Sequence, residues 1–332
     1  MTFSFYAGAD CSKKTIDFVV FDGQAFSHQM KVSNNIDAIC EYFNNLEDLD
    51  MGDLALCMEH TGVYGENLIA ACISLGIAIY IEGGYQIKHS LGLMRGKSDA
   101  LDAKRIAEYA FRFNDKLHFY TPERQVIKEL KLLRACRIRL IKSKNLLLVP
   151  INELKPFSSP ESVQMLQHSV YKTIAAIDQD IKDIETKIKN IIDQDDNLKK
   201  LRKLITSVPN VGDVTATELI IKTNEFKKFD SAKKLACFSG VVPFEYSSGS
   251  SIRGRVRISH RADKTLKTLL HLCAMSAINS KGELFEYYTK KVNQGKNKMC
   301  VVNAVRNKIL KRVFAVVKNQ TMYQKKFKLY LA

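Results

Sequence analysis

The residues best suited to chemistry lie in one stretch, residues 246–257, called here the serine loop. It combines four serines, three arginines and two glycines: Ser247, Ser248, Ser250, Ser251, Arg253, Arg255, Arg257, Gly249 and Gly254. Glycine lets a backbone approach a ligand closely, and the planar guanidinium group matches phosphate oxygens. A serine hydroxyl in such surroundings can attack a phosphodiester and hold it covalently. The alternative is a flexible loop that contacts phosphate without chemistry, since short motifs often match by chance.

Four carboxylates suggest a second kind of chemistry. Asp10 and Glu59 each end an apolar stretch with the character of a strand, which predicts that both lie near the same edge of a sheet. Asp99 and Asp102 are three residues apart, so they share one face of a helix that Ser98 is suited to cap. We call these four residues the acidic tetrad.

Clustered carboxylates repel one another unless a cation or a proton lies between them. Hard oxygen ligands of this kind suit Mg²⁺ or Mn²⁺, and two such ions can clamp a phosphodiester. Each acid also has a structural alternative. The helix dipole alone favours Asp99 and Asp102 at a helix start, Asp10 is compatible with a turn, and Glu59 with a solvated strand end.

The first third of the chain must position the acidic tetrad, and its pattern predicts a mixed α/β domain. Strands are predicted over residues 5–10, 15–21, 25–32, 54–59 and 77–81, and helices over residues 35–46 and 65–75. Asp22-Gly23 is typical of a tight hairpin turn between two strands.

The middle of the chain is predicted to be helical. Residues 126–149 lack Gly and Pro, and Pro150, Pro156 and Pro160 mark a break after them. A seam of β-branched residues then recurs at alternating spacings of four and three: Val170, Ile174, Ile177, Ile181, Ile184, Ile188 and Ile191. This seam fits either an intramolecular helical hairpin or a contact between subunits.

The C-terminal third is basic and mainly helical. Residues 205–216 resemble a helix-hairpin-helix turn, in which backbone N–H groups after Gly212 would face a phosphate; a turn without binding is the alternative. Helices are predicted over residues 266–278 and 301–317. The second is expected to expose four basic side chains, those of Arg306, Lys308, Lys311 and Arg312.

Charge and composition narrow the class of protein. Residues 251–332 hold 19 Lys and Arg against 3 Asp and Glu, while the first 250 residues balance. Such a basic end predicts a polyanionic partner. Nucleic acid is favoured over a membrane surface, because no apolar run reaches the ~18 residues of a bilayer span and no signal peptide is evident. Eight scattered cysteines without a Cys-x-x-Cys pair favour reduced thiols in a cytosol.

Taken together and in this order, the motifs resemble the insertion-sequence-110 family of transposases, the DEDD-type, bridge-RNA-guided recombinases. The resemblance runs from about Tyr6 to Lys318. Its markers are residues 8–13 (GADCSK), 58–64 (MEHTGVY), 97–103 (KSDALDA), 208–212 (VPNVG) and 248–254 (SGSSIRG). The chain departs from the family's usual residues at three places. It has His260-Arg261-Ala262-Asp263 where the family often has Lys-x-Gly, and Lys267 where the family usually has arginine. It has His60 where the family usually has a small residue or proline.

The resemblance implies a fold and a set of roles. It implies a ribonuclease H-like (Holliday-junction-resolvase-like) domain over residues 1–120, an α-helical coiled-coil linker over 121–200 and a mainly α-helical transposase domain over 201–332. Asp10, Glu59, Asp99 and Asp102 correspond to the catalytic, Mg²⁺-binding tetrad, and Ser248 to the catalytic serine. A structured bridge RNA, donor and target DNA, and a homodimer or homotetramer are the implied partners, in a prokaryotic cytoplasm at the nucleoid.

The sequence therefore predicts an RNA-guided DNA recombinase that moves an insertion sequence through a phosphoserine–DNA intermediate. Arg253, Arg255, Arg257 and Gly212 are the candidate nucleic-acid contacts. Two alternatives stay open: a metal-dependent nuclease that uses only the acidic tetrad, and a nucleic-acid-binding remnant without catalysis.

Overall fold

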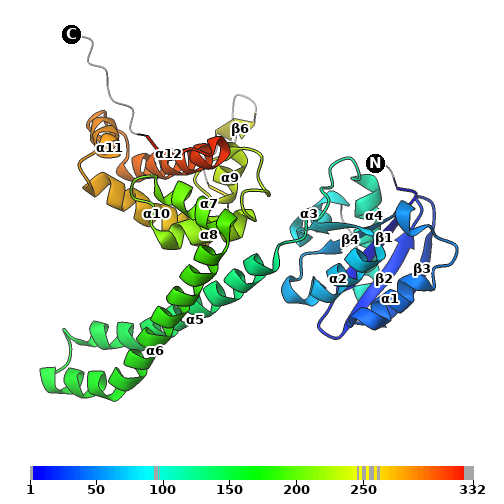
Figure 1. Cartoon of the computed structure of the whole chain (residues 1–332), viewed down its shortest axis with the longest axis horizontal. Helices are drawn as coiled ribbons and strands as arrows, with labels where there is room; N and C mark the ends of the chain where they lie inside the picture. Colours follow the sequence, from blue (N-terminus) through cyan, green and yellow to red (C-terminus); the bar gives the residue numbers. More distant parts are fainter. Residues whose placement is uncertain are drawn as a thin grey trace, which may run out of the picture. The chain divides into compact units, whose positions relative to one another are not determined.

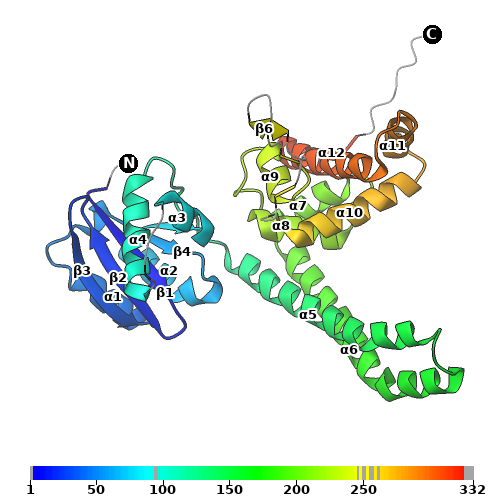
Figure 2. The ribbon, with the colours of Figure 1, turned by 180° about the vertical axis from the view of Figure 1, so that it is seen from behind.

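The computed structural model describes residues 3–92, 96, 98–244, 247–248, 252–253, 258–259 and 262–324, with the backbone alone at 247–248 and 252–253. The chain forms two compact units, Met1–Pro122 and Glu123–Ala332 (Figures 1 and 2). The second unit takes in both the helical middle and the basic C-terminal third. In the described part of the chain, no helix is long and apolar enough to cross a membrane.

A five-stranded mixed sheet forms the centre of the first unit. Its strands are β1 (Phe5–Cys11), β2 (Thr15–Phe21), β3 (Phe26–Ser33), β4 (Leu54–Glu59) and β5 (Ala78–Glu82). They lie in the order β3-β2-β1-β4-β5. The pairs β1–β2 and β2–β3 are antiparallel, whereas β1–β4 and β4–β5 are parallel. The predicted mixed α/β organisation is confirmed, and it is consistent with a ribonuclease H-like domain.

Local chemistry explains where several of these elements start and stop. The Asp22 side chain accepts hydrogen bonds from the backbone N–H groups of Gln24 and Ala25, both at 2.7 Å, and so closes the predicted β2–β3 turn. Asn35 caps α1 (Ile36–Asn44) in the same way, and the left-handed Gly76 ends α2 (Glu66–Leu75). Single-turn 3₁₀ helices precede β4 and α2, at Met51–Asp53 and Gly62–Gly65. After β5 the chain forms the short helix α3 (Gly84–Ser90) and then α4 (Asp99–Arg112).

The two faces of the sheet bury different helices because strand side chains alternate. Phe18 of β2 packs on the side of α1 and α2, with its ring stacked on Tyr42 of α1 at 4.5 Å between centroids. Tyr6 of β1 and Cys57 of β4 face the other side, where they meet Ile106 and other apolar residues of α4. Helix α4 therefore packs its side chains against this second face of the sheet.

The second unit begins with two long helices, α5 (Gln125–Leu154) and α6 (Pro160–Gln194), which lie side by side as an antiparallel hairpin (Figures 1 and 2). Ion pairs Arg137–Glu185 at 2.7 Å and Lys144–Asp178 at 2.5 Å join them. Of the predicted seam, Ile184 and Ile188 are buried. The seam thus makes at least an intramolecular contact.

The first long helix ends later in the chain than its predicted end at residue 149. Helix α5 continues through Pro150 to Leu154, and the next helix begins at Pro160. Proline lacks an N–H and removes one helical hydrogen bond. The rest of the last turn nevertheless stays helical.

The remaining helices enclose the largest core of the molecule: α7 (Asp196–Thr206), α8 (Asp213–Thr223), α9 (Ala232–Phe238), α10 (Lys264–Asn279), α11 (Glu283–Asn293) and α12 (Lys298–Asn319). Within the serine loop, two-residue strands β6 (Ser247–Ser248) and β7 (Ile252–Arg253) pair in antiparallel fashion, with Ser248 opposite Ile252. Within the second unit, the serine loop lies in the chain between α9 and α10.

Candidate active site

A close contact between β1 and α4 brings the first acids together. A Cβ atom added at Gly8 would lie 2.1 Å from the Ala103 carbonyl oxygen and 2.5 Å from the Ala107 nitrogen, so only glycine allows this approach. Asp10 follows Gly8 by two residues on the same face of β1. Asp99 and Asp102 lie in the first turn of α4, which passes directly over that face.

The electrostatics of Asp10 show that the acids are near one another. Burial and, in decreasing order, the negative charges of Asp102, Asp99, Glu59 and Asp17 together raise the pKa of Asp10 from its usual 3.8 to about 6. The structure therefore places the whole acidic tetrad around one edge of the sheet. Their catalytic and metal-binding roles stay a prediction.

The two acids of α4 are held by local contacts. As predicted, Ser98 caps the helix, because its hydroxyl accepts a hydrogen bond from the Leu101 N–H at 3.3 Å. Asp102 forms an ion pair with Arg105 at 2.6 Å. Asp99 lies 3.6 Å from the Lys31 ammonium. The positive end of the helix dipole also favours both carboxylates.

Glu59 reaches the same edge from β4, beside a second glycine. A Cβ atom on Gly84, the first residue of α3, would lie 2.0 Å from Glu59 Oε1. Because Glu59 and Glu82 are directly opposite each other in the parallel pair of β4 and β5, this edge carries an additional acid. Gly84 thus supplies the space that the Glu59 carboxylate occupies.

Sequence reasoning missed Asp17 and Lys31, which complete the edge. Asp17 lies opposite both Asp10 on β1 and Lys31 on β3. It is 9% exposed, and the Lys31 ammonium lies 3.3 Å from its Oδ2. Lys31 therefore bridges Asp17 and Asp99. The available signal was a single acid inside the apolar run of β2, Thr-Ile-Asp-Phe-Val-Val-Phe.

The donor set suits a hard divalent cation, since the tetrad offers only carboxylate oxygens. In the part of the chain that the structure describes, no three His, Cys, Asp or Glu side chains converge closely enough to form a complete ligand group. The nearby carboxylates nevertheless add to the effect of burial in raising the pKa of Asp10. The residues that could hold Mg²⁺ here are Asp10, Glu59, Asp99 and Asp102.

The serine loop is anchored by the turn that follows α9. Gly240 adopts a left-handed φ of 64°, and an added Cβ would lie 2.5 Å from the Ala262 Cβ. The Asp263 N–H donates to the Phe238 carbonyl at 2.8 Å, and Asp263 pairs with Lys222 of α8 at 2.8 Å. These contacts fix where the serine loop leaves and re-enters the helical unit.

The candidate residues of the serine loop are only partly described. The backbones of Ser248 and Arg253 lie in β6 and β7. Their side chains, together with the whole of Arg255 and Arg257, lie outside the described residues. The nucleophilic role of Ser248 and the phosphate-binding roles of the three arginines therefore stay predictions.

The predicted helix-hairpin-helix turn leads from α7 to α8, and Gly212 is the N-cap residue of α8. Among the described residues, no heavy atom outside the local backbone lies within 4 Å of a Cβ added there, so the space beside the Gly212 Cα is open. The next residue, Asp213, pairs with Arg202 at 2.7 Å, and this hydrogen bond lowers the pKa of Asp213. A phosphate at Gly212 would thus meet a carboxylate as well as N–H groups.

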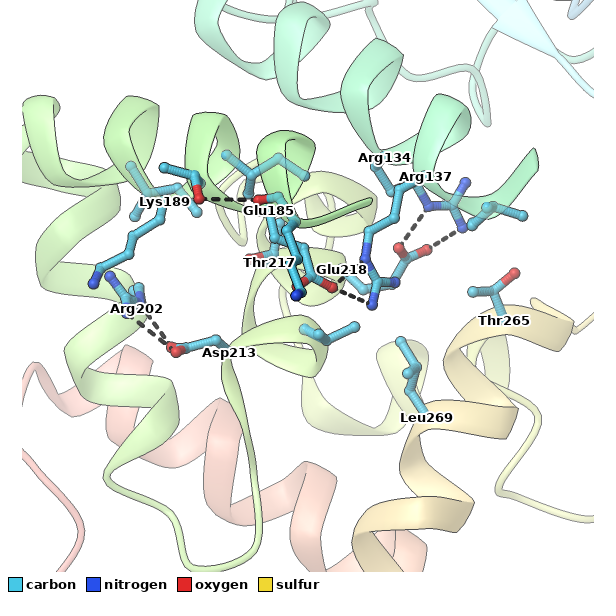
Figure 3. A pocket seen from close by; sticks show the side chains of 16 residues that line it. Arg134, Arg137, Glu185, Lys189, Arg202, Asp213, Thr217, Glu218, Thr265 and Leu269 are labelled. Atoms are coloured by element: carbon cyan, nitrogen blue, oxygen red, sulfur yellow. Dashed lines mark hydrogen bonds and ion pairs between the residues drawn. The ribbon is translucent and has the colours of Figure 1, made fainter. Parts of the chain in front are cut away.

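A cavity of about 630 Å³ adjoins this turn, between the α5–α6 hairpin and helices α7, α8 and α10. Figure 3 shows Arg202 with Asp213 on one side and Arg134 with Glu218 on another. Glu218 is 3% exposed, and burial raises its pKa although Arg134 lies at 2.5 Å. Most charges that line this cavity are therefore already paired.

One basic side chain of α12 lies where the sequence did not predict it. Lys308 and Lys311 are exposed, as expected, and Arg312 is partly exposed in an ion pair with Glu283 at 2.8 Å. Arg306 is 6% exposed, so the prediction that it faces solvent is wrong. It points into the helical core because it lies on the same side of α12 as the buried residues Val302 and Ile309, three or four residues away.

Comparison with known proteins covers both units. Residues 7–149 match the DEDD-type IS110 transposase family, described as Transposase. Residues 202–289 match the family described as Transposase IS116/IS110/IS902. The two matched segments contain all members of the acidic tetrad and Ser248.

Two relatives illustrate the similarity. The chain is 25% identical over 328 residues to the pilin gene-inverting protein of Moraxella bovis, covering 97% of this chain and 98% of that protein. It is 26% identical over 262 residues to the transposase for insertion sequence element IS1328 of Yersinia enterocolitica, covering 69% and 74% of the two chains. With both family segments in the expected order, the chain belongs to the IS110 family of transposases and is a DNA transposase/recombinase.

Proposed function

We propose that this enzyme is an RNA-guided DNA recombinase that moves an insertion sequence through a covalent serine intermediate. The observation that carries the proposal is the charge at the sheet edge, where three other carboxylates of the tetrad help to raise the pKa of Asp10. Such an edge is suited to a divalent cation beside a phosphodiester. Ser248 lies in the second matched segment, in the first of two short paired strands.

The chemical step transfers a phosphoryl group from DNA to the protein. The Ser248 Oγ–phosphorus bond forms, the bond from phosphorus to the leaving sugar oxygen breaks, and the serine proton is removed while the leaving oxygen gains one. The phosphoserine link keeps the energy of the phosphodiester, so a second DNA end can reverse the step without ATP. Bound Mg²⁺ would polarise the phosphate, with Asp10, Glu59, Asp99 and Asp102 as its ligands.

Nucleic-acid recognition follows from the basic C-terminal third. We propose that donor and target DNA are read by base pairing with a structured bridge RNA, and that protein contacts are mainly to phosphates. Arg253, Arg255, Arg257 and the turn at Gly212 are the proposed contacts. A homodimer or homotetramer would allow the serine of one subunit to meet the acidic tetrad of another.

The decisive experiment is a covalent trap. The protein is mixed with Mg²⁺, RNA transcribed from the flanking element, and donor and target DNA, then denatured and separated on a gel. We expect a protein–DNA adduct in the wild type that is lost in Ser248→Ala and in Asp10→Ala. Ser247→Ala, the neighbouring serine of β6, is the matched control and should keep the adduct.

Three results would count against the proposal. Cut DNA without an adduct, unchanged in Ser248→Ala, would leave a metal-dependent nuclease that uses the acidic tetrad alone. An adduct lost in Ser247→Ala but kept in Ser248→Ala would move the nucleophile by one residue. Equal adduct formation without the RNA would remove the guide from the reaction.

A further inference from the structure

Arg306 of α12 is a buried cation that has no acidic partner within the described part of the chain. Its Nη2 lies 2.6 Å from His271 Nδ1 on α10, and its Nη1 lies 3.5 Å from Asn303 Oδ1. Its Nε is buried, and no described residue offers it a hydrogen-bond acceptor. Among the residues that the structure describes, no carboxylate pairs with this guanidinium group.

The contact with His271 does not supply negative charge. A guanidinium nitrogen only donates, so His271 Nδ1 must accept and the imidazole must be neutral, with its proton on Nε2. Burial and the nearby positive charge of Arg306 lower the pKa of His271, and burial lowers the pKa of Arg306. A buried ion that lacks a counter-charge carries a desolvation penalty even after local relaxation. The fold nevertheless buries the Arg306 guanidinium group between α10 and α12.

That place is one helical turn from a contact with the segment that leads into the serine loop. Asn303, one turn before Arg306, donates from its Nδ2 to the Val241 carbonyl at 2.8 Å. Val241 follows the left-handed Gly240, where an added Cβ would lie 3.5 Å from Lys267 Cδ. Lys267 lies one turn before His271 on α10, and both are partly exposed. Asn303 and Lys267 therefore lie against the segment that leads into the serine loop, and Arg306 and His271 lie one turn further along the same two helices.

We propose that Arg306 and Lys267 form a phosphate-binding subsite at the base of the serine loop. The ligand is a backbone phosphate of nucleic acid, an identification that rests on the proposed function. Nη1 is the group left for an anion, because its contact with Asn303 is at the outer limit of a hydrogen bond. In this weakly screened position, the guanidinium charge attracts a phosphate more strongly than an exposed arginine does.

The subsite would position the DNA or RNA strand beside Ser248 and would take no part in bond breaking. It also explains why an uncompensated cation is kept in the core. Its counter-charge arrives with the substrate, so binding offsets the desolvation penalty that the unbound protein carries at Arg306.

Thermal unfolding in phosphate tests the proposal without reference to activity. The wild type, Arg306→Met and Lys311→Gln are unfolded in inorganic phosphate and in chloride at equal ionic strength. Lys311→Gln is the matched control, since it removes one exposed charge from the same helix. We expect phosphate to raise the Tm of the wild type and of Lys311→Gln, through preferential binding to the folded state.

For Arg306→Met we expect a Tm in chloride equal to or above that of the wild type, and no rise in phosphate. Its affinity for duplex DNA should fall about 10-fold, and the slope of log K against log salt should decrease by about 1. A lower Tm with the phosphate response intact, or failure to fold, would show that Arg306 is a structural cation and would overturn the proposal. Equal loss of the phosphate response in Lys311→Gln would show an effect of net charge alone.

Glu245 is the one Asp or Glu of the sequence outside the described residues, so it provides a second test. If Glu245→Gln lowers the Tm of the wild type but not of Arg306→Met, the chain supplies its own counter-charge and the subsite does not exist. Equal effects in both backgrounds support the external phosphate. The covalent trap with Ser248→Ala is independent of these results, so failure of the subsite and failure of the serine mechanism are distinguishable.

Discussion

Gly8 of β1 and Ala103 of α4 are in backbone contact: a Cβ atom on Gly8 would lie 2.1 Å from the Ala103 carbonyl oxygen. This contact sets the height of α4 above the sheet. It therefore also sets the distance from Asp10, two residues after Gly8, to Asp99 and Asp102 in the first turn of α4.

Gly8→Ala should destabilise the protein by about 1–3 kcal/mol, because the clash is with helix backbone and cannot be relieved by a side-chain rotation. It should also abolish adduct formation by moving the two aspartates. Denaturant unfolding and the covalent trap measure the two effects. Gly83→Ala, with open space around its Cβ, is the control and should stay within about 0.5 kcal/mol of the wild type. An unchanged unfolding midpoint in Gly8→Ala would show that the β1–α4 contact is looser than described.

Gly84→Ala should impair activity far more than stability. The new methyl group would occupy the position of Glu59 Oε1, at 2.0 Å, and the flexible glutamate side chain can move away at little cost in folding energy. A displacement of about 1 Å at a reacting centre can lower the rate roughly 10²-fold. The measurement is adduct yield together with Tm, again beside Gly83→Ala. Full activity in Gly84→Ala would exclude Glu59 from the reaction.

Asp10 should make stability depend on pH. The unfolded carboxyl group titrates near its usual 3.8 and the folded one at about 6. The folded state therefore holds the proton more tightly, and stability at this site is lost as the pH rises from about 4 through 6. Asp10→Asn should raise the Tm at pH 7 to 8 and leave it nearly unchanged below pH 4. Glu47→Gln, at an exposed position of the same unit, should show no such pH dependence.

Mg²⁺ extends this test to the metal. If the acidic tetrad binds the ion, Mg²⁺ should raise the Tm of the wild type at pH 7, because the cation offsets the repulsion at Asp10. The rise should be smaller in Asp10→Asn. Identical Mg²⁺ responses in the two proteins would place metal binding elsewhere.

Arg134→Met should destabilise the helical unit by about 3–5 kcal/mol, because it leaves the buried Glu218 without its partner. Burial already raises the pKa of Glu218, and loss of Arg134 raises it further. The destabilisation should therefore decrease on acidification, as Glu218 takes up a proton. Unfolding at pH 5 and pH 8 measures this difference. Arg134→Met combined with Glu218→Leu should recover most of the loss, and a double variant as unstable as Arg134→Met would show that packing, not charge, is responsible.

Much of the site was accessible from sequence because its signals are local. The strands that end in Asp10 and Glu59, the Asp22-Gly23 turn and the Ser98 cap each depend on a few neighbouring residues. A strand alternates with a period of two and a helix start needs a single capping side chain, so short patterns suffice. The ordered set of motifs around these residues and Ser248 also predicted the family, which the comparisons bear out.

Only the tertiary structure decided which distant side chains meet. Asp17 joins the acidic edge through its register with Asp10 and Lys31, and strand register is set by long-range pairing. Arg306 became a core residue because α12 packs against α10, a contact that no local pattern in a basic helix reveals. Sequence by itself thus determined the elements and their reactive ends, whereas packing determined the charges around them, since burial and neighbours fix a side chain's electrostatics.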